Sequence, residues 1–318
     1  MNLLKLLLGF IAFFAMSIAS QANPVIRDGP SAFNSYLFGI NNLGQQVGGY
    51  DSATTSGTAI VWASDGSYTT FTAPGGGFTY ALDINDSGDI VGFYNDSVTA
   101  RGYLRSAAGL FTSFDVPGAS TTRAQGINNK GQIVGVYQVA TTLGGFLREA
   151  DGTFHLFQVS SATRAEPSKI NDGGTIVGRD DGPGFFGTID GGFTLFNAQG
   201  GTLAYGINDL GVIVGRRDNA FGDTSAFIRQ ADGSIQIYRL TGASTTTFYD
   251  INNSGVMVGM YQDGRGDAHG FILNQALVNT GLISTPGSAS LLASALLMIG
   301  LFGRHCRMPR SCSPMHLR

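Results

Sequence analysis

The sequence predicts an all-β fold, a β-propeller of six four-stranded repeats. Three observations support this prediction. A phrase of the form Ile-Asn-x-x-Gly occurs six times at intervals of 37 to 44 residues, and a Val-Gly pair starts seven residues after each Ile. Each repeat also holds four short apolar runs separated by Gly, Asn, Asp, Ser and Thr. Four antiparallel strands at this period are typical of propeller blades, because one such unit cannot bury both faces alone.

The elements of each repeat follow one another in a constant order. The first strand ends at the repeat Ile, and the Asn/Asp-x-Gly step predicts a tight turn with Gly in the left-handed conformation. The second strand carries the Val-Gly pair. The third strand is centred on Ile60, Tyr103, Phe146, Phe185, Phe227 and Phe271. The fourth strand is centred on Phe71, Phe114, Phe157, Phe196 and Tyr238, which leaves the sixth repeat without one.

Two segments are candidates for the missing strand. One lies near Leu282 in "ALVNTGLIS", and the other is the N-terminal stretch "NPVIRDG" around Arg27. The N-terminal stretch is favoured, because it would close the ring with the two ends of the chain. An open solenoid of β-hairpins is the alternative architecture, since the period alone does not require closure.

Both ends of the chain carry apolar segments that differ from the repeats. Residues 1–22 combine Lys5, the run "LLLGFIAFFAM" and the small-residue exit "SIASQA", which predicts a secretory signal peptide and an exported protein. The propeller is expected over 23–283 and a sorting or anchor segment over 284–318. In that segment the apolar run 289–303 predicts a hydrophobic helix, and the basic tail 304–318 would stay in the cytoplasm.

Charge and cysteine content limit the possible partners. Five of the 19 basic residues lie outside 23–283, so the 22 acidic residues of this body face 14 basic ones and its net charge is about −8. An acidic body with no basic stripe argues against a nucleic-acid partner. Cys306 and Cys312 both lie in the tail, so no disulfide is expected in the body.

Two known bacterial families resemble parts of the chain. The phrases "FDVPGASTTRAQGINNKGQIVGVY" (114–137) and "AHGFIL" (268–273) resemble the HAF family of extracellular repeats, over about residues 34–274. The tail resembles a PEP-CTERM sorting signal in which Gly287 stands where that family has Glu. These resemblances imply a secreted or surface protein, with an exosortase-type processing enzyme as a partner.

Reactive groups are sparse in the predicted propeller. Of the four histidines, only His155 and His269 lie in it, and both fall at repeat positions in or beside strands. No HExxH motif and no Cys nucleophile is present in this region. No catalytic residue and no organic cofactor is therefore predicted.

Calcium is a candidate cofactor. Two repeats read D-x-N-x-S-G, like the first half of an EF-hand loop, with Tyr94 and Tyr261 where the bidentate Glu would stand. The same letters suit the hairpin turn, which is the favoured interpretation. The candidate ligands are Asp83, Asn85, Ser87, Asp250, Asn252 and Ser254.

Tyrosines mark a candidate ligand face. In four repeats a Tyr follows the Val by three residues, which places equivalent rings where they can stack on sugars or pack at strand ends. These residues are Tyr50, Tyr94, Tyr137 and Tyr261.

Together, these features predict a secreted or surface-anchored, non-catalytic propeller. It would act as a binding or structural module of the bacterial cell envelope or extracellular matrix. The expected partners are an extracellular polysaccharide or an envelope protein, and the membrane through the C-terminal helix. The alternative is a carbohydrate-active hydrolase or lyase on the same scaffold. Carboxylates that converge at the central channel would favour this alternative.

Overall fold

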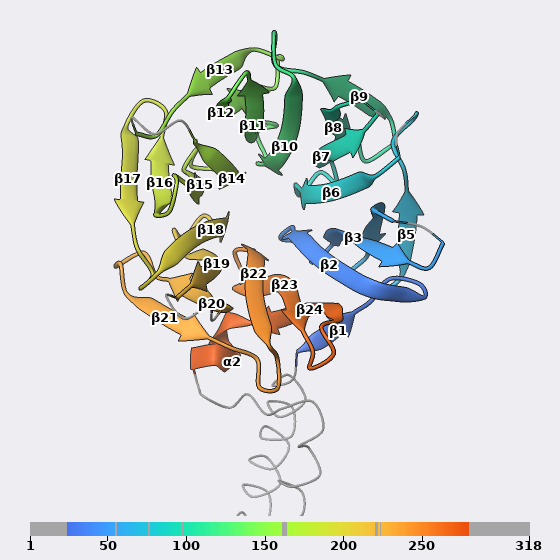
Figure 1. The fold of residues 1–318 in the computed structure, drawn as a ribbon, viewed down its shortest axis with the longest axis vertical. Coiled ribbons are helices and arrows are strands. Elements are labelled where there is room, and N and C mark those ends of the chain that lie inside the picture. Colours follow the sequence, from blue (N-terminus) through green and yellow to red (C-terminus); the bar gives the residue numbers. More distant parts are fainter. Residues whose placement is uncertain are drawn as a thin grey trace, which may run out of the picture.

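The computed structural model describes residues 24–279, except residues 55, 76, 97, 161–163, 220–221 and 223. Figure 1 shows the described strands arranged radially around a central axis. The predicted fold class, an all-β propeller, is confirmed. The predicted signal peptide (1–22) and the sorting or anchor segment (284–318) lie outside the described residues.

Four sheets each contain four consecutive antiparallel strands. The first consists of β6 (Thr79–Ile84), β7 (Ile90–Asn95), β8 (Ala100–Arg105) and β9 (Phe111–Phe114). The second consists of β10 (Thr121–Ile127), β11 (Ile133–Val139), β12 (Thr142–Arg148) and β13 (Phe154–Phe157). The third consists of β14 (Glu166–Ile170), β15 (Ile176–Arg179), β16 (Gly184–Thr188) and β17 (Gly192–Phe196). The fourth consists of β18 (Gly201–Ile207), β19 (Ile213–Asp218), β20 (Thr224–Arg229) and β21 (Ile235–Tyr238).

A fifth sheet contains eight strands. One half consists of β2 (Ala32–Ile40), β3 (Gln46–Ser52), β4 (Thr58–Trp62) and β5 (Tyr68–Phe71). The other half consists of β22 (Thr245–Ile251), β23 (Val256–Gln262), β24 (Ala268–Asn274) and β1 (Val25–Arg27). The halves meet at one parallel bridge, Asn34 to Ala268, and we interpret them as two neighbouring blades. Figure 1 shows the first strand of each group (β2, β6, β10, β14, β18, β22) beside the axis.

The N-terminal strand completes the last group. β1 pairs antiparallel with β24 through Val25–Ile272, Ile26–Phe271 and Arg27–Gly270. Ile26 packs against the buried cluster that contains Phe271. The favoured N-terminal closure is therefore the one observed, and the competing segment at Leu282 lies outside the described residues. After β24 the chain forms a short helix, α2 (Gln275–Asn279), and no helix in 24–279 is long and apolar enough to cross a membrane.

The recurring Val-Gly pair is explained by crowding between the first three strands of a blade. At Gly135, a Cβ atom would lie 2.1 Å from the carbonyl oxygen of Arg123 on the first strand and 2.6 Å from the ring of Phe146 on the third. Phe146 is fully buried, as are Tyr103, Phe185, Phe227 and Phe271 at the same place in other blades. Burial of one such ring stabilises the fold by about 1.5–3 kcal/mol. The Gly therefore lets a large side chain fill the blade, which is aromatic in five of the six repeats and Ile60 in the first.

The predicted turns are also present. In the turn between β10 and β11, Gly131 has φ +75° and its N–H donates to the carbonyl of Asn128 (3.1 Å). The same left-handed conformation occurs at Gly44, Gly88, Gly174, Gly211 and Gly255. All six turns therefore reach the same end of the central channel, where their Asn and Asp side chains meet.

Candidate functional site

The Asn of each Ile-Asn phrase serves its own turn and the next blade. The Asn128 Oδ1 atom accepts from the backbone N–H groups of Lys130 (3.1 Å) and Gln132 (3.0 Å). Its Nδ2 atom donates to the carbonyl of Asn171 in the following blade (3.1 Å). Equivalent bonds run around the channel and return to the start, from Asn41 to Asn85, Asn128, Asn171, Asn208 and Asn252, and from Asn252 to Asn41.

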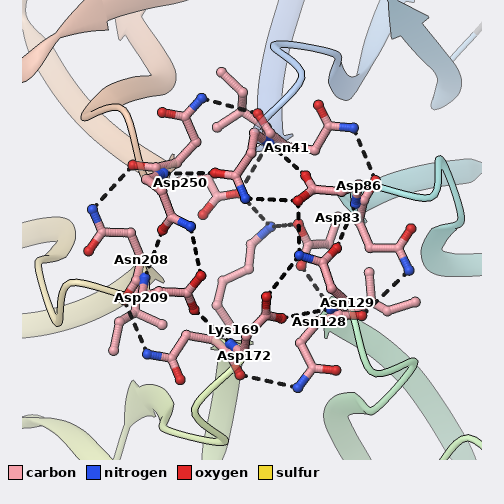
Figure 2. A pocket seen from close by; sticks show the side chains of 18 of the residues that line it. Asn41, Asp83, Asp86, Asn128, Asn129, Lys169, Asp172, Asn208, Asp209 and Asp250 are labelled. Atoms are coloured by element: carbon pink, nitrogen blue, oxygen red, sulfur yellow. Dashed lines mark hydrogen bonds and ion pairs between the residues drawn. The ribbon is translucent and has the colours of Figure 1, made fainter.

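The next residue of each phrase forms a second closed ring. The Asn129 N–H donates to Asp172 Oδ1 (2.8 Å), and its amide Nδ2 donates to Asp86 Oδ2 (3.0 Å) and Asp172 Oδ2 (2.9 Å) (Figure 2). Backbone-to-side-chain bonds of this kind link Asn42, Asp86, Asn129, Asp172, Asp209 and Asn253 in a cycle. We call the two rings together the polar mouth. Its repeated Asn and Asp residues hold neighbouring blades together.

A lysine occupies the channel beneath the polar mouth. The Lys169 Nζ atom lies 2.5 Å from Asp83 Oδ1 and 3.2 Å from Asp250 Oδ2, and it donates to the carbonyl of Leu82 (3.0 Å). All three charged side chains are buried. Figure 2 shows Lys169 reaching across the channel between the two aspartates. We call Asp83, Lys169 and Asp250 the lysine floor.

The aspartates of the lysine floor also join blades. Asp83 accepts from the backbone N–H groups of Ile84 (2.9 Å) and Ile127 (2.8 Å). Asp250 accepts likewise from Ile251 (2.9 Å) and Ile40 (3.0 Å). Burial is the main cause that raises the pKa of both carboxyls, to about 7 for Asp250, and Lys169 opposes it. Two negative charges thus share one buried cation, and burial disfavours the second negative charge.

Glycines make room for the lysine floor in the alternate blades. In three repeats the residue before the repeat Ile belongs to the lysine floor. In the other three repeats this residue is a glycine: Gly39, Gly126 or Gly206. A Cβ atom at Gly126 would lie 2.8 Å from the Lys169 Cα atom, and one at Gly206 would lie 2.6 Å from the Asp250 Cα atom. Small and charged residues therefore alternate around the axis.

The six candidate calcium ligands fall in this region but do not form two compact clusters. Asp83 and Asp250 face Lys169, while Asn85 and Asn252 bond to turn amides and to the neighbouring blade. Ser87 and Ser254 are exposed. Among the described residues, no group of three or more His, Cys, Asp or Glu side chains is arranged to hold a metal ion. Calcium binding stays a prediction.

The four predicted ligand-face tyrosines lie on second strands, toward the channel end away from the polar mouth. Tyr50 and Tyr94 are buried in the blades, and the Tyr94 hydroxyl lies 3.0 Å from Ser113 Oγ. Tyr137 and Tyr261 are half-buried, and Tyr261 stacks on His269. Tyr50 and Tyr94 thus pack inside the blades, and a ligand face at the four tyrosines stays a prediction.

A different set of side chains lines the channel below the lysine floor. They come from the innermost strands, two and four residues before each repeat Ile. A hollow of about 160 Å³ lies there, bordered by Lys169 on the side of the floor. Its lining includes Phe38, Leu82, Gln125, Ser168, Tyr205 and Tyr249, one residue from each innermost strand.

One side of this hollow is aromatic. The Phe38 ring is 5.0 Å from the Tyr249 ring and 5.6 Å from the Tyr36 ring, between centroids. Tyr205 continues the row beyond Tyr249 (5.0 Å), and Tyr80 continues it beyond Phe38 (6.4 Å). We call Tyr36, Phe38, Tyr80, Tyr205 and Tyr249 the aromatic arc. All five are half-buried, so part of each ring is accessible.

The hydroxyl groups of the tyrosines in the aromatic arc have no protein partner in the described part of the chain. Among the described residues, no hydrogen bond involves the hydroxyls of Tyr36, Tyr80, Tyr205 or Tyr249, whereas the buried Tyr103 hydroxyl donates to the carbonyl of Tyr80 (3.0 Å). Burial raises the pKa of all four tyrosines, so they are neutral at physiological pH. A neutral hydroxyl both donates and accepts a hydrogen bond. Two of these tyrosines, Tyr205 and Tyr249, line the hollow itself and can offer such groups to a ligand.

The opposite side of the hollow is polar and opens into a groove between two blades. The groove has a volume of about 390 Å³ and shares Gln125 and Glu166 with the channel hollow. Arg123 lines this groove, and its guanidinium stands 4.9 Å above the centroid of the Phe93 ring. Arg164 also lines the groove and is ion-paired with Glu166. We call Arg123, Gln125, Arg164 and Glu166 the polar wall.

Sequence reasoning missed the aromatic arc and the polar wall, although the repeats hold a signal for them. The residue three before each repeat Ile is always apolar, and the fifth before it is Ser or Thr in five of the six repeats. The second and fourth residues before the Ile differ in type from repeat to repeat. The blade requires the residue types at the third and fifth positions before the Ile. The second and fourth positions face the channel, where the residue type can vary.

Comparison with known proteins bears on the fold alone. No family model and no curated protein matches the chain. Among solved structures, it resembles TolB from Acinetobacter baumannii, with 11% identity and a TM-score of 0.50 over 75% of this chain and 63% of that one. It also resembles a streptogramin B lyase, with 12% identity and a TM-score of 0.49 over 78% and 96%. A third is regucalcin, a calcium-binding protein from Agrobacterium tumefaciens, with 14% identity and a TM-score of 0.49 over 80% and 96%.

Proposed function

We propose that this protein is a non-catalytic binding module of the bacterial cell envelope or extracellular matrix, and that its ligand is a polysaccharide held in the central channel. The observation that carries the proposal is the aromatic arc facing a polar wall. A sugar ring presents an apolar C–H face and a rim of hydroxyl groups. Exposed aromatic rings suit the face, and side-chain amides, hydroxyls and charged groups suit the rim.

The channel carboxylates support binding rather than catalysis. Asp83 and Asp250 do converge on the axis, which is the arrangement expected of the enzymatic alternative. However, each accepts two backbone N–H groups and contacts Lys169, so both are already used to join blades. A general acid or base must reach the substrate, within hydrogen-bond distance or through one water. The lysine floor is buried and lies at the end of the hollow.

One observation favours the second candidate, a carbohydrate-active hydrolase or lyase. The pKa of Asp250 is raised to about 7, and a carboxyl that titrates near neutrality is suited to proton transfer. Cleavage of the bound polysaccharide would identify this activity directly, and the same binding samples can be examined for it.

The binding test uses the full chain and matrix polysaccharide recovered from the bacteria that produce it. Co-sedimentation should show saturable binding, and the polysaccharide should keep its chain length during a long incubation. Tyr249→Ala should weaken binding, because it removes a central ring of the aromatic arc. Tyr68→Ala is the matched control, since Tyr68 is exposed on the outer strand β5. Absence of binding would refute the proposal, and steady shortening of the polysaccharide would replace it with the enzymatic one.

The location of the protein belongs to the same proposal. The apolar segments at both ends support export followed by anchoring or exosortase-type processing at the cell surface. Intact-mass measurement of the protein from membrane and extracellular fractions tests this. An extracellular species that ends near Thr285 would support processing, and a membrane species that retains Arg318 would support a lasting anchor. A species found only in the cytoplasm, with residues 1–22 intact, would contradict export.

A further inference from the structure

We infer that the channel and its groove select an acidic saccharide, whose carboxylate binds Arg123 while a sugar ring lies against the aromatic arc. This inference rests on the proposed function and specifies the class of ligand.

Among the residues that the structure describes, Arg123 has no carboxylate partner. No Asp or Glu among the described residues lies within ion-pair distance of its guanidinium, and the side chain is exposed on β10. Its position above the Phe93 ring supports the planar group from below and leaves the N–H donors at its edge free. A guanidinium held in this way presents a fork that matches a carboxylate with two parallel hydrogen bonds.

The remaining charges of the groove do not neutralise Arg123. Among the described residues, Glu166 is the one carboxylate that lines the groove, and both of its oxygens accept from Arg179 Nη2 (3.0 Å each). Arg164 is ion-paired with the same Glu166. One carboxylate is therefore shared by two arginines, and the polar wall and Arg179 together carry an excess of positive charge. This excess occurs in a protein whose net charge is −3, so it marks a place for an anion.

The shape of the site suggests a ring-shaped neighbour for that anion. The groove and the channel hollow are both lined by Gln125 and Glu166, and Lys169 also lines the hollow. A ligand whose carboxylate reaches Arg123 therefore extends toward the aromatic arc, where no hydrogen bond among the described residues involves the four tyrosine hydroxyls. A uronic acid residue has these parts: a carboxylate, an apolar ring face and several hydroxyl groups. An acidic peptide also has carboxylates, but its backbone presents no apolar ring face to the aromatic arc.

The test compares matched ligands by isothermal titration calorimetry with the full chain. The probes are trimers of galacturonate, glucuronate and mannuronate, each with its neutral methyl ester, together with a tri-aspartate peptide. At least one acid trimer should bind 10-fold or more tightly than its ester. Arg123→Gln should abolish this preference, so that the acid trimer binds no more tightly than its ester, because Gln keeps hydrogen bonding and loses the charge. Arg265→Gln, in the exposed β23–β24 turn, is the matched control.

Each other outcome has a defined meaning. Equal affinity for acid and ester trimers would overturn the acidic preference and leave the saccharide-binding function standing. Binding of tri-aspartate with no saccharide binding would overturn both in favour of an acidic peptide, and no binding by any probe would likewise overturn both. An unchanged preference in a folded Arg123→Gln variant would move the anion site away from Arg123.

Discussion

Replacement of Lys169 by Met should destabilise the protein in a strongly pH-dependent way. Lys169 is the buried cation between Asp83 and Asp250, at 2.5 Å and 3.2 Å from their oxygens. At an effective dielectric constant of about 20, these contacts correspond to attractions of roughly 7 and 5 kcal/mol. Without the cation, the least costly response of the two carboxylates is to take up protons. The free energy of this protonation therefore determines how much stability the variant loses.

That cost follows from the pKa values. Asp250, with a pKa raised to about 7, is already partly protonated at neutral pH. Protonation of Asp83, from an unfolded-state pKa of about 3.9, costs at most about 4 kcal/mol at pH 7 and about 1.5 kcal/mol at pH 5. The upper value agrees with the roughly 3–5 kcal/mol lost when a buried ion pair is broken. The destabilisation by Lys169→Met should therefore shrink as the pH falls.

The stability of the wild-type protein should also decrease as the pH rises, but by a smaller amount. Burial raises the pKa values of Asp83 and Asp250 above those of the unfolded chain, so the folded state holds more protons between about pH 4 and 7. The stability that these carboxyls contribute is present at low pH and is lost as the pH rises through about 7. Other titrating groups also contribute to the pH dependence of stability. The difference in the free energy of unfolding between variant and wild type therefore isolates the contribution of the lysine floor.

Chemical denaturation at pH 5, 6, 7 and 8 measures these differences. Lys130→Met is the matched control, because Lys130 is exposed in the turn after β10 and should cost less than about 0.5 kcal/mol at every pH. A loss for Lys169→Met that stays constant across this range, or that grows as the pH falls, would refute the reasoning. It would mean that water or ions reach the two aspartates and neutralise them without protonation.

Two further predictions concern the connections between blades. Asn128→Ala removes a bond to the next blade and three bonds within its turn, so it should lower the free energy of unfolding by about 3 kcal/mol, while Asn129→Ala at the exposed rim should cost about 1 kcal/mol. Denaturant titration ranks the two, and equal losses would show that the inner ring has no special weight. Ile26→Asp should lower the melting temperature by several degrees, because Ile26 is packed in the closing strand, whereas exposed Val25→Asp in the same strand should change it little. Indistinguishable melting curves for these two variants would argue against closure by β1.

The repeats predicted the blades well because blade geometry acts through constant residues. The Val-Gly pair, the left-handed turn Gly and the large apolar residue of the third strand occupy fixed places, and each has a local steric reason. The role of Asn128 was not predicted beyond the turn itself. Its contact with Asn171 lies in the neighbouring blade, and it appears only when the blades stand around an axis.

The channel was harder to predict for two reasons. Lys169 stands at the repeat position where the D-x-N-x-S-G pattern has its first Asp. In the sequence alone, it therefore looks like a loss of one metal ligand. In the ring it is the counter-ion of residues two repeats before and two repeats after it. Phe38, Tyr205 and Tyr249 of the aromatic arc stand at a repeat position whose residue type is not constant. A search for residues that all repeats share therefore does not find them.

Closure by β1 has a consequence for the order in which the molecule assembles. Residues 25–27 are among the first of the described chain to be synthesised, yet their partners, residues 270–272, are among the last. The earlier blades can form from neighbouring segments, but the last blade must wait until nearly the whole chain is present, and it then joins two distant segments at an entropic cost. Folding should therefore end with a slow, concentration-independent docking step, and a chain cut short before β24 would leave β1 without a partner and an open strand edge exposed to other chains.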